Sequence, residues 1–193
     1  MKKTKTVFIV RLGILTALSI VLNIFSIDLP MGNRISFSLL PSFVAGVFLG
    51  PLAGGVVGFS GDLLGFFISP PPPPFGFYMW QVGLAKTLFG VIPGLIFKYW
   101  KKGNPTLRIT VSFILCYIIC TAGLNTYALW STLRSRPQGY PNGFFMYLSI
   151  RLPLQTLNTV VNFIAAIALY ESGALHKTIG TDNKLLNKKT KST

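Results

Sequence analysis

Acidic residues are scarce in this chain of 193 residues, which has four Asp and Glu against 18 Lys and Arg, and a single histidine. Charged residues make up 11% of the sequence, compared with roughly 25% in typical soluble domains. The one histidine, His176, lies in the polar C-terminal stretch, and the acids are scattered. A metal cluster or a catalytic triad would need more of these side chains. We therefore expect no enzymatic activity, no metal site and no resident cofactor.

Cysteine is nearly absent too, and a phosphate-binding loop is missing. Cys116 and Cys120 are four residues apart in an apolar run, which is typical of small buried side chains on one helix face. In the stretch 83–87, Lys86 is followed by threonine, but the G-x-x-x-x-G-K-[ST] pattern that binds phosphates is not there. We expect neither thiol chemistry nor nucleotide binding by this chain.

Apolar residues are what the sequence has in excess, at 51%. Six apolar segments approach the length that crosses about 30 Å of hydrocarbon at about 1.5 Å per residue. They are residues 7–27, 36–50, 52–68, 77–97, 107–130 and 145–170. The sequence thus predicts an all-α, polytopic membrane protein, in which residues 1–175 form one bundle of six transmembrane helices surrounded by lipid. Residues 176–193 are predicted to form a basic cytoplasmic tail.

The basic residues are placed at the ends of these segments. They gather at the amino end, in the connection 98–108 and in the tail, whereas the alternate connections have few of them. Lys and Arg are enriched on the cytoplasmic side of membrane proteins, so both termini are predicted to be cytoplasmic. Because the charges do not form one patch, the excess of positive charge does not indicate a nucleic-acid partner.

Two charges lie inside predicted spans. Asp62 and Lys86 fall at nearly the same depth of two neighbouring, oppositely directed segments. An isolated charge at that depth is costly, so we predict that the two form a buried ion pair. The pair could fix the register of the helices or contact a ligand.

The last segment has a polar stripe. Arg151, Gln155, Asn158 and Asn162 share one helix face, and an inward-facing stripe of this kind either joins helices or lines a wet cavity. The guanidinium of arginine offers a planar pair of donors that matches a carboxylate, so Arg151 favours the interpretation that the stripe lines a cavity. Further candidates near the outer side are Arg34, Asn125, Tyr127 and Trp130, although single aromatic residues there also suit a membrane-interface belt. We expect the polar lining to come mainly from the last two segments.

The outer connections 28–35, 69–76 and 131–144 are predicted to be long and irregular. The second contains five consecutive prolines, residues 70–74, which favour a stiff extended conformation. They could form part of a lid over a ligand or act as a spacer.

Four stretches carry a family resemblance. They read RISFSLLPSFVAGVFLGPLAGGVVGFSGDLLGFFI at 34–68, LAKTLFGVIPGLIF at 84–97, LNTYALW at 124–130 and IRLPLQ at 150–155. In this order they resemble the substrate-binding S components of energy-coupling factor (ECF) transporters, and the last two stretches resemble the folate-type branch. The resemblance implies a bacterial cell-membrane protein that captures a vitamin from outside and delivers it by docking to a transmembrane coupling subunit (T component) and two cytoplasmic ATPases.

The same resemblance implies roles for particular residues. ATP would be used by the partner subunits only, and the family's Ala-x-x-x-Ala coupling motif falls on Gly13 and Ala17. Folate has an anionic glutamyl tail and a flat pterin rich in donors and acceptors. The candidate substrate-binding residues are Arg34, Asn125, Tyr127, Trp130, Arg151, Gln155 and Asn158. Two alternatives stay open: an S component for another heterocyclic vitamin, and a self-sufficient channel or carrier for a small anion.

Overall fold

The computed structural model describes residues 2–29, 33–71, 73, 75–100, 104–134 and 143–172. Its elements, in chain order, are α1 (Lys2–Ile24), β1 (Ile27–Leu29), β2 (Asn33–Ile35), α2 (Leu39–Leu49), α3 (Pro51–Ile68), α4 (Trp80–Tyr99), α5 (Pro105–Cys116), the π-helix η2 (Tyr117–Asn125), α6 (Thr126–Arg134) and α7 (Phe144–Glu171). Apart from the three-residue strands β1 and β2, the described elements are helices, as predicted. The predicted tail 176–193 lies outside the described residues.

Five helical stretches of the described chain are long and apolar enough to cross a membrane. The predicted second span is the exception, because α2 has only 11 residues. At about 1.5 Å per residue it extends about 16 Å, roughly half of a hydrocarbon core. It ends at Gly50, whose φ of 106° lies in the left-handed region where glycine meets no steric penalty. Pro51 then begins α3 at the first helical position, where a missing N–H costs nothing.

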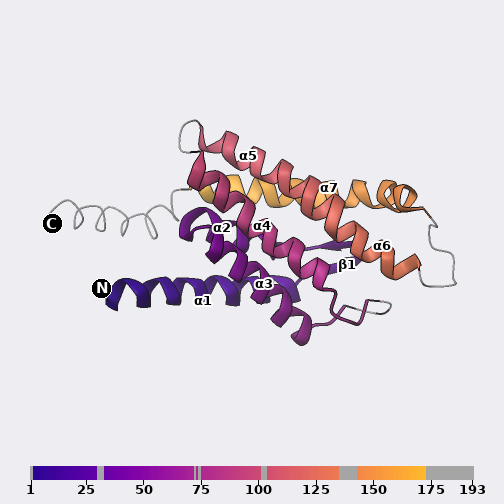
Figure 1. Ribbon diagram of the computed structural model, residues 1–193, viewed down its shortest axis with the longest axis horizontal. Coiled ribbons are helices and arrows are strands. Elements are labelled where there is room, and N and C mark those ends of the chain that lie inside the picture. Colours follow the sequence, from indigo (N-terminus) through magenta and orange to yellow (C-terminus); the bar gives the residue numbers. More distant parts are fainter. Residues whose placement is uncertain are drawn as a thin grey trace.

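The helices lie roughly side by side along the long axis of an elongated bundle (Figure 1). In that view α1 begins and α7 ends at the left end, where α4 also gives way to α5, and the β1–β2 hairpin lies toward the opposite end. The end of α6 and the start of α7 lie toward the same end of the molecule as the hairpin (Figure 1).

Helices α2, α3 and α4 approach closely because glycines meet at their contacts. A Cβ built on Gly90 of α4 would collide with the carbonyl oxygen of Gly54 in α3, and a Cβ on Gly54 would collide with that of Gly90. A Cβ on Gly94 would lie 2.6 Å from Pro51 Cα. Small residues allow such backbone contact in membranes, where apolar burial gives little drive for helix association.

The fifth predicted segment is one continuous helical stretch, Pro105–Arg134, that changes its winding. Its middle, η2, is a π-helix of nine residues. π-Helical segments are rare, and many of them occur at functional sites. Here the segment presents Cys120 and Thr121, both buried, toward the interior of the molecule.

The connection 28–35 was predicted to be irregular, and this prediction is wrong. Ile27–Leu29 and Asn33–Ile35 pair as an antiparallel hairpin in which Asp28 is opposite Arg34. Strand β1 alternates apolar and polar residues, but Asn33 and Arg34 of β2 are both polar, and three residues are too few for a strand pattern to be recognised.

The core that supports the hairpin end consists of aromatic and aliphatic side chains. Phe113 of α5 contacts Phe43 of α2, Phe89 of α4 and Phe163 of α7, with ring centroids 5.1–5.6 Å apart. Cys116 is a buried free thiol in the same cluster, as the sequence predicts for a small buried side chain. Four helices thus converge on one ring, which fixes the walls of the space beyond it.

Candidate functional site

A cavity of about 610 Å³ lies inside the hairpin end of the bundle. Each of the five long helical stretches contributes a polar side chain or a ring to its wall, and the hairpin and the connection before α4 complete it. The polar side chains that line it include Asn23, Asn33, Arg34, Asp62, Tyr78, Lys86, Asn125, Arg151, Gln155 and Asn158. A cavity of this size is typical of small-molecule sites.

The polar stripe of α7 forms one wall. Arg151, Gln155, Asn158 and Asn162 are all buried, so none of them faces lipid. Arg151 Nε and Gln155 Nε2 both donate to Asn33 Oδ1, over 3.3 Å and 3.2 Å. One helix face thereby holds strand β2 by its side chains.

The same stripe also fixes the segment that follows β2. Ser36 N donates to Asn158 Oδ1 over 3.2 Å, and Asn162 Nδ2 donates to Ser36 O over 3.0 Å. The stripe therefore does both things that the sequence analysis considered: it joins two parts of the fold, and it lines a cavity through Arg151, Gln155 and Asn158.

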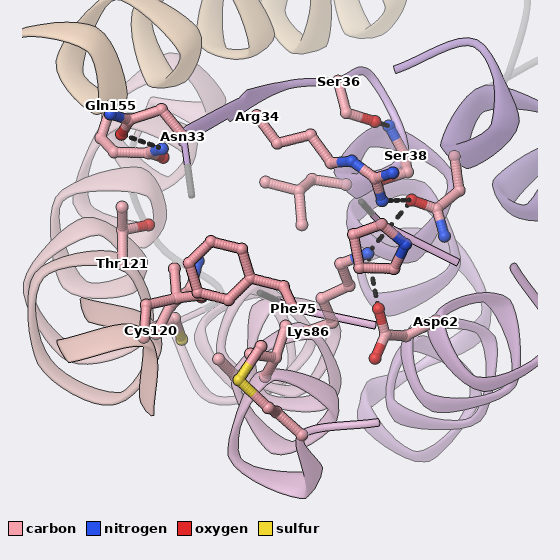
Figure 2. Close-up of a pocket in the computed structure, with 18 of the residues that line it drawn as sticks. Asn33, Arg34, Ser36, Ser38, Asp62, Phe75, Lys86, Cys120, Thr121 and Gln155 are labelled. Atoms are coloured by element: carbon pink, nitrogen blue, oxygen red, sulfur yellow. Dashed lines mark hydrogen bonds and ion pairs between the residues drawn. The ribbon is translucent and has the colours of Figure 1, made fainter. Parts of the chain in front are cut away.

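The opposite wall holds the buried charges. Lys86 Nζ lies 2.6 Å from Asp62 Oδ1, so these residues form the ion pair expected from their depth in the sequence. Lys86 Nζ also donates to Asn23 Oδ1 over 3.4 Å, and Arg34 Nη1 donates to the same oxygen over 3.3 Å. In Figure 2, Asp62 and Lys86 lie on one side of the cavity and Asn33 and Gln155 on the other.

Glycines in α3 and α4 make room for this wall. A Cβ on Gly65 would collide with the Asn23 side chain, and one on Gly83 would collide with the Tyr78 hydroxyl. Burial and the nearby Asp62 carboxylate raise the pKa of Tyr78 to about 12, since both disfavour a phenolate. Tyr78 is thus a neutral phenol beside the ion pair at any physiological pH.

Flat and stiff groups close the cavity toward the end of the bundle. Phe66, Phe75 and Phe77 line it, and Phe75 is also buried in a small cluster with Leu129 and Tyr147. Pro71 and Pro73 of the proline run line the cavity as well. Part of the proline run therefore contributes to the wall of the cavity.

Five of the seven candidate binding residues are brought together around the cavity: Arg34, Asn125, Arg151, Gln155 and Asn158. Tyr127 and Trp130 do not line it, and this part of the expectation needs correction. Tyr127 lies midway between Asn125 and Leu129, which face the cavity, so the helix turns it to the opposite side, where it is 54% exposed. Trp130 instead packs on Phe144 and under Arg134.

Sequence reasoning missed several lining residues in the first half of the chain. Asn23, Asn33, Ser36 and Ser38 all contribute, so the polar lining does not come mainly from the last two segments. For Asn23 a signal was available: Ser19 and Asn23 are polar, four residues apart in an apolar helix, and both are 3% exposed. Asn33 and Ser36 lie in the short hairpin region, where no periodic pattern could develop.

The charge of the cavity follows from its lining. Among the side chains described around it, three are cationic (Arg34, Lys86 and Arg151) and one is anionic (Asp62), a net charge of +2. Aromatic rings, amide groups and this excess of positive charge fit a flat, polar ligand that carries carboxylates. Within the described residues, no group of three His, Cys, Asp or Glu side chains lies close enough to hold a metal ion.

The two predicted coupling residues lie away from the cavity, on α1. Gly13 and Ala17 are exposed one turn apart on the same helix face, and a Cβ on Gly13 would meet nothing within 4 Å. This face is therefore accessible to another protein or to lipid.

Comparisons with known proteins agree with this architecture. Two solved structures are similar: one described as the crystal structure of FolT bound with folic acid, and one described as the structure and mechanism of the S component of a bacterial ECF transporter. The first has a TM-score of 0.58 and 22% identity, and covers 83% of this chain and 90% of its own. The second has a TM-score of 0.63 and 23% identity, and covers 88% of this chain and 96% of its own.

None of the curated proteins compared with this chain matches it. The family model of the substrate-specific component of ECF transporters matches residues 7–170, which is most of the chain. That family is a transporter component rather than an enzyme family, in agreement with the scarcity of catalytic side chains. The chain therefore belongs to the substrate-specific components of ECF transporters.

Proposed function

We propose that this S component binds folate in the cavity at the hairpin end of the bundle. The observation that carries the proposal is Arg151, which is 2% exposed and lies at the wall of a cavity that also offers amide groups and aromatic rings. A solved structure of the same fold holds folic acid, which supports this choice of ligand among the vitamins.

The chemistry of folate matches the lining. The two carboxylates of its glutamyl tail suit the cationic side chains Arg34 and Arg151, which offer planar donors. Its pterin suits the amides of Asn125, Gln155 and Asn158, and rings such as Phe75 offer a flat surface for stacking. No further cofactor is needed for binding.

We further infer how the chain lies in the membrane. Residues 1–175 form one membrane domain of six spans, with α2 as the short second span. The membrane is a bacterial cell membrane, and both termini are cytoplasmic. The cavity then opens to the outside. The exposed Gly13–Ala17 face of α1 would dock to the T component, and two ATPases bound to it would use the ATP.

Equilibrium binding to the purified protein in detergent tests the ligand. We expect folic acid to bind with submicromolar Kd, and the Arg151→Gln variant to bind it at least tenfold more weakly, because a charge-assisted pair to a carboxylate is lost. Thermal unfolding of both proteins controls for folding. Submicromolar binding of a different vitamin, with no binding of folic acid, would exclude the assignment.

A further inference from the structure

The surroundings of Arg151 are unusual for a buried cation. Its guanidinium donates from Nε to Asn33 Oδ1 over 3.3 Å and from Nη1 to Thr126 Oγ1 over 3.4 Å, and both acceptors are neutral. Within the part of the chain that the structure describes, Arg151 has no carboxylate partner. Glu171, on the same helix, is twenty residues away, or about 30 Å along the axis. Buried charges are ordinarily paired with an opposite charge.

Asn33 is the fixed point of this arrangement. Its Oδ1 accepts from Gln155 Nε2 over 3.2 Å as well as from Arg151, and the residue is 3% exposed. Its backbone is held in β2 opposite Leu29, and the following Ser36 is tied to α7. The guanidinium is therefore held on one edge by a rigidly placed oxygen.

The opposite wall of the cavity is built differently. There Lys86 pairs with the Asp62 carboxylate at 2.6 Å, which cancels its charge at close range. Figure 2 shows the two arrangements across the cavity, with the dashed contact between Gln155 and Asn33 on one side and that between Lys86 and Asp62 on the other. On the wall with Asn33, by contrast, the described contacts hold Arg151 through neutral groups.

We propose that Asn33 is a positioning residue that orients Arg151 through a neutral oxygen, so that the positive charge of Arg151 stays available for an anionic group of the ligand. An aspartate at this position would orient the guanidinium equally well but would supply the counter-charge internally. The inference rests on the proposed function, because it assumes that the cavity binds an anionic vitamin.

The Asn33→Asp variant separates positioning from charge, because aspartate is nearly isosteric and accepts the same two hydrogen bonds. The probes are folic acid and its diamide, in which both glutamyl carboxylates are converted to neutral amides. Wild-type protein should bind folic acid at least tenfold more tightly than the diamide. In Asn33→Asp we expect folic acid binding to weaken at least tenfold, while binding of the diamide changes less than threefold.

Two further variants support the comparison. Asn104→Asp makes the same substitution at the exposed residue before α5, at the other end of the bundle, and should leave both affinities unchanged. Thr126→Asp places a carboxylate at the second partner of Arg151 and should reproduce the selective loss, which covers the case that Asn33→Asp does not fold. Thermal unfolding of each variant reports folding independently.

The outcomes distinguish this inference from the ligand assignment. If wild-type protein prefers another carboxylate vitamin, such as biotin or pantothenate, the folate assignment fails, and the same comparison is made with that vitamin and its amide. An equal loss of acid and amide in the aspartate variants, or an unchanged affinity for the acid, overturns the role of Asn33. A wild type that does not discriminate acid from amide, that prefers a neutral or cationic vitamin, or that binds none of the carboxylates, overturns it as well.

Discussion

At the scale of single residues, polar side chains in an apolar chain show where the molecule is hollow. Asn23 is an example: its oxygen accepts from both Lys86 and Arg34, and Gly65 of the neighbouring helix leaves the space for its side chain. In a bilayer such groups need protein or water partners, so they face inward. The buried polar residues therefore describe the cavity better than the aromatic ones, of which Tyr127 and Trp130 lie outside it.

The Asp62–Lys86 pair gives a prediction at this scale. Replacing Lys86 with Met leaves the Asp62 carboxylate without its partner and should lower the free energy of unfolding by up to about 3 kcal/mol. This value is at the lower end of the range for breaking a buried pair, because the Lys86 side chain is 19% exposed. The double variant Asp62→Leu, Lys86→Met removes both charges and should be more stable than the single variant. Chemical unfolding in detergent measures both, and a silent single substitution would show that the pair contributes nothing.

At the scale of elements, two features of backbone geometry place the site. The π-helical winding of η2 brings Cys120, Thr121 and Asn125 to the cavity wall, and glycines bring α3 against α4. The glycines can be recognised in the sequence as an excess of small residues. The π-helix cannot be predicted in the same way, because local sequence preferences do not distinguish it from an α-helix.

The glycine contact between α3 and α4 gives the second prediction. In Gly90→Ala the new methyl group collides with the Gly54 carbonyl, and the helices must separate, at a cost of about 1–3 kcal/mol. Because α3 carries Asp62 and α4 carries Lys86, ligand binding should weaken as well. Thermal unfolding and folic acid titration measure the two effects.

Gly13→Ala is the matched control, since a Cβ at Gly13 meets nothing within 4 Å. Its stability and its affinity for folic acid should equal those of the wild type. It also restores an Ala-x-x-x-Ala pattern with Ala17 on the exposed face of α1. Equal stability of Gly90→Ala and Gly13→Ala would contradict close packing at the α3–α4 contact.

At the scale of the whole molecule, the bundle is polar inside at one end and packed with aromatic rings toward the other. The cavity lies at the hairpin end, whereas Phe113 and its neighbours fill the middle of the bundle. The start of α1 and the end of α7 lie at the end of the bundle away from the hairpin (Figure 1). This polarity suits a subunit that takes up its ligand at one face of a membrane.

The orientation in the membrane is the third prediction. In a background with Cys116 and Cys120 replaced by serine, a cysteine introduced at Gly143, before α7, should react with an impermeant maleimide added to whole cells. A cysteine at Asn104, before α5, should react only after the cells are opened, because the basic residues around it favour the cytoplasmic side. The reverse labelling pattern would show that the chain is inserted the other way round.

The sequence by itself determined the apolar helices, the depth at which Asp62 meets Lys86 and the common face of Arg151, Gln155 and Asn158, because each of these follows from helix periodicity and from the cost of charge in lipid. Only the tertiary structure decided that β1 and β2 form a hairpin, that Asn23 and Asn33 hold the cations of the cavity, and that Tyr127 turns away from it. These features depend on contacts between residues such as Asn33 and Arg151, 118 positions apart in the chain, and no local pattern records such a contact.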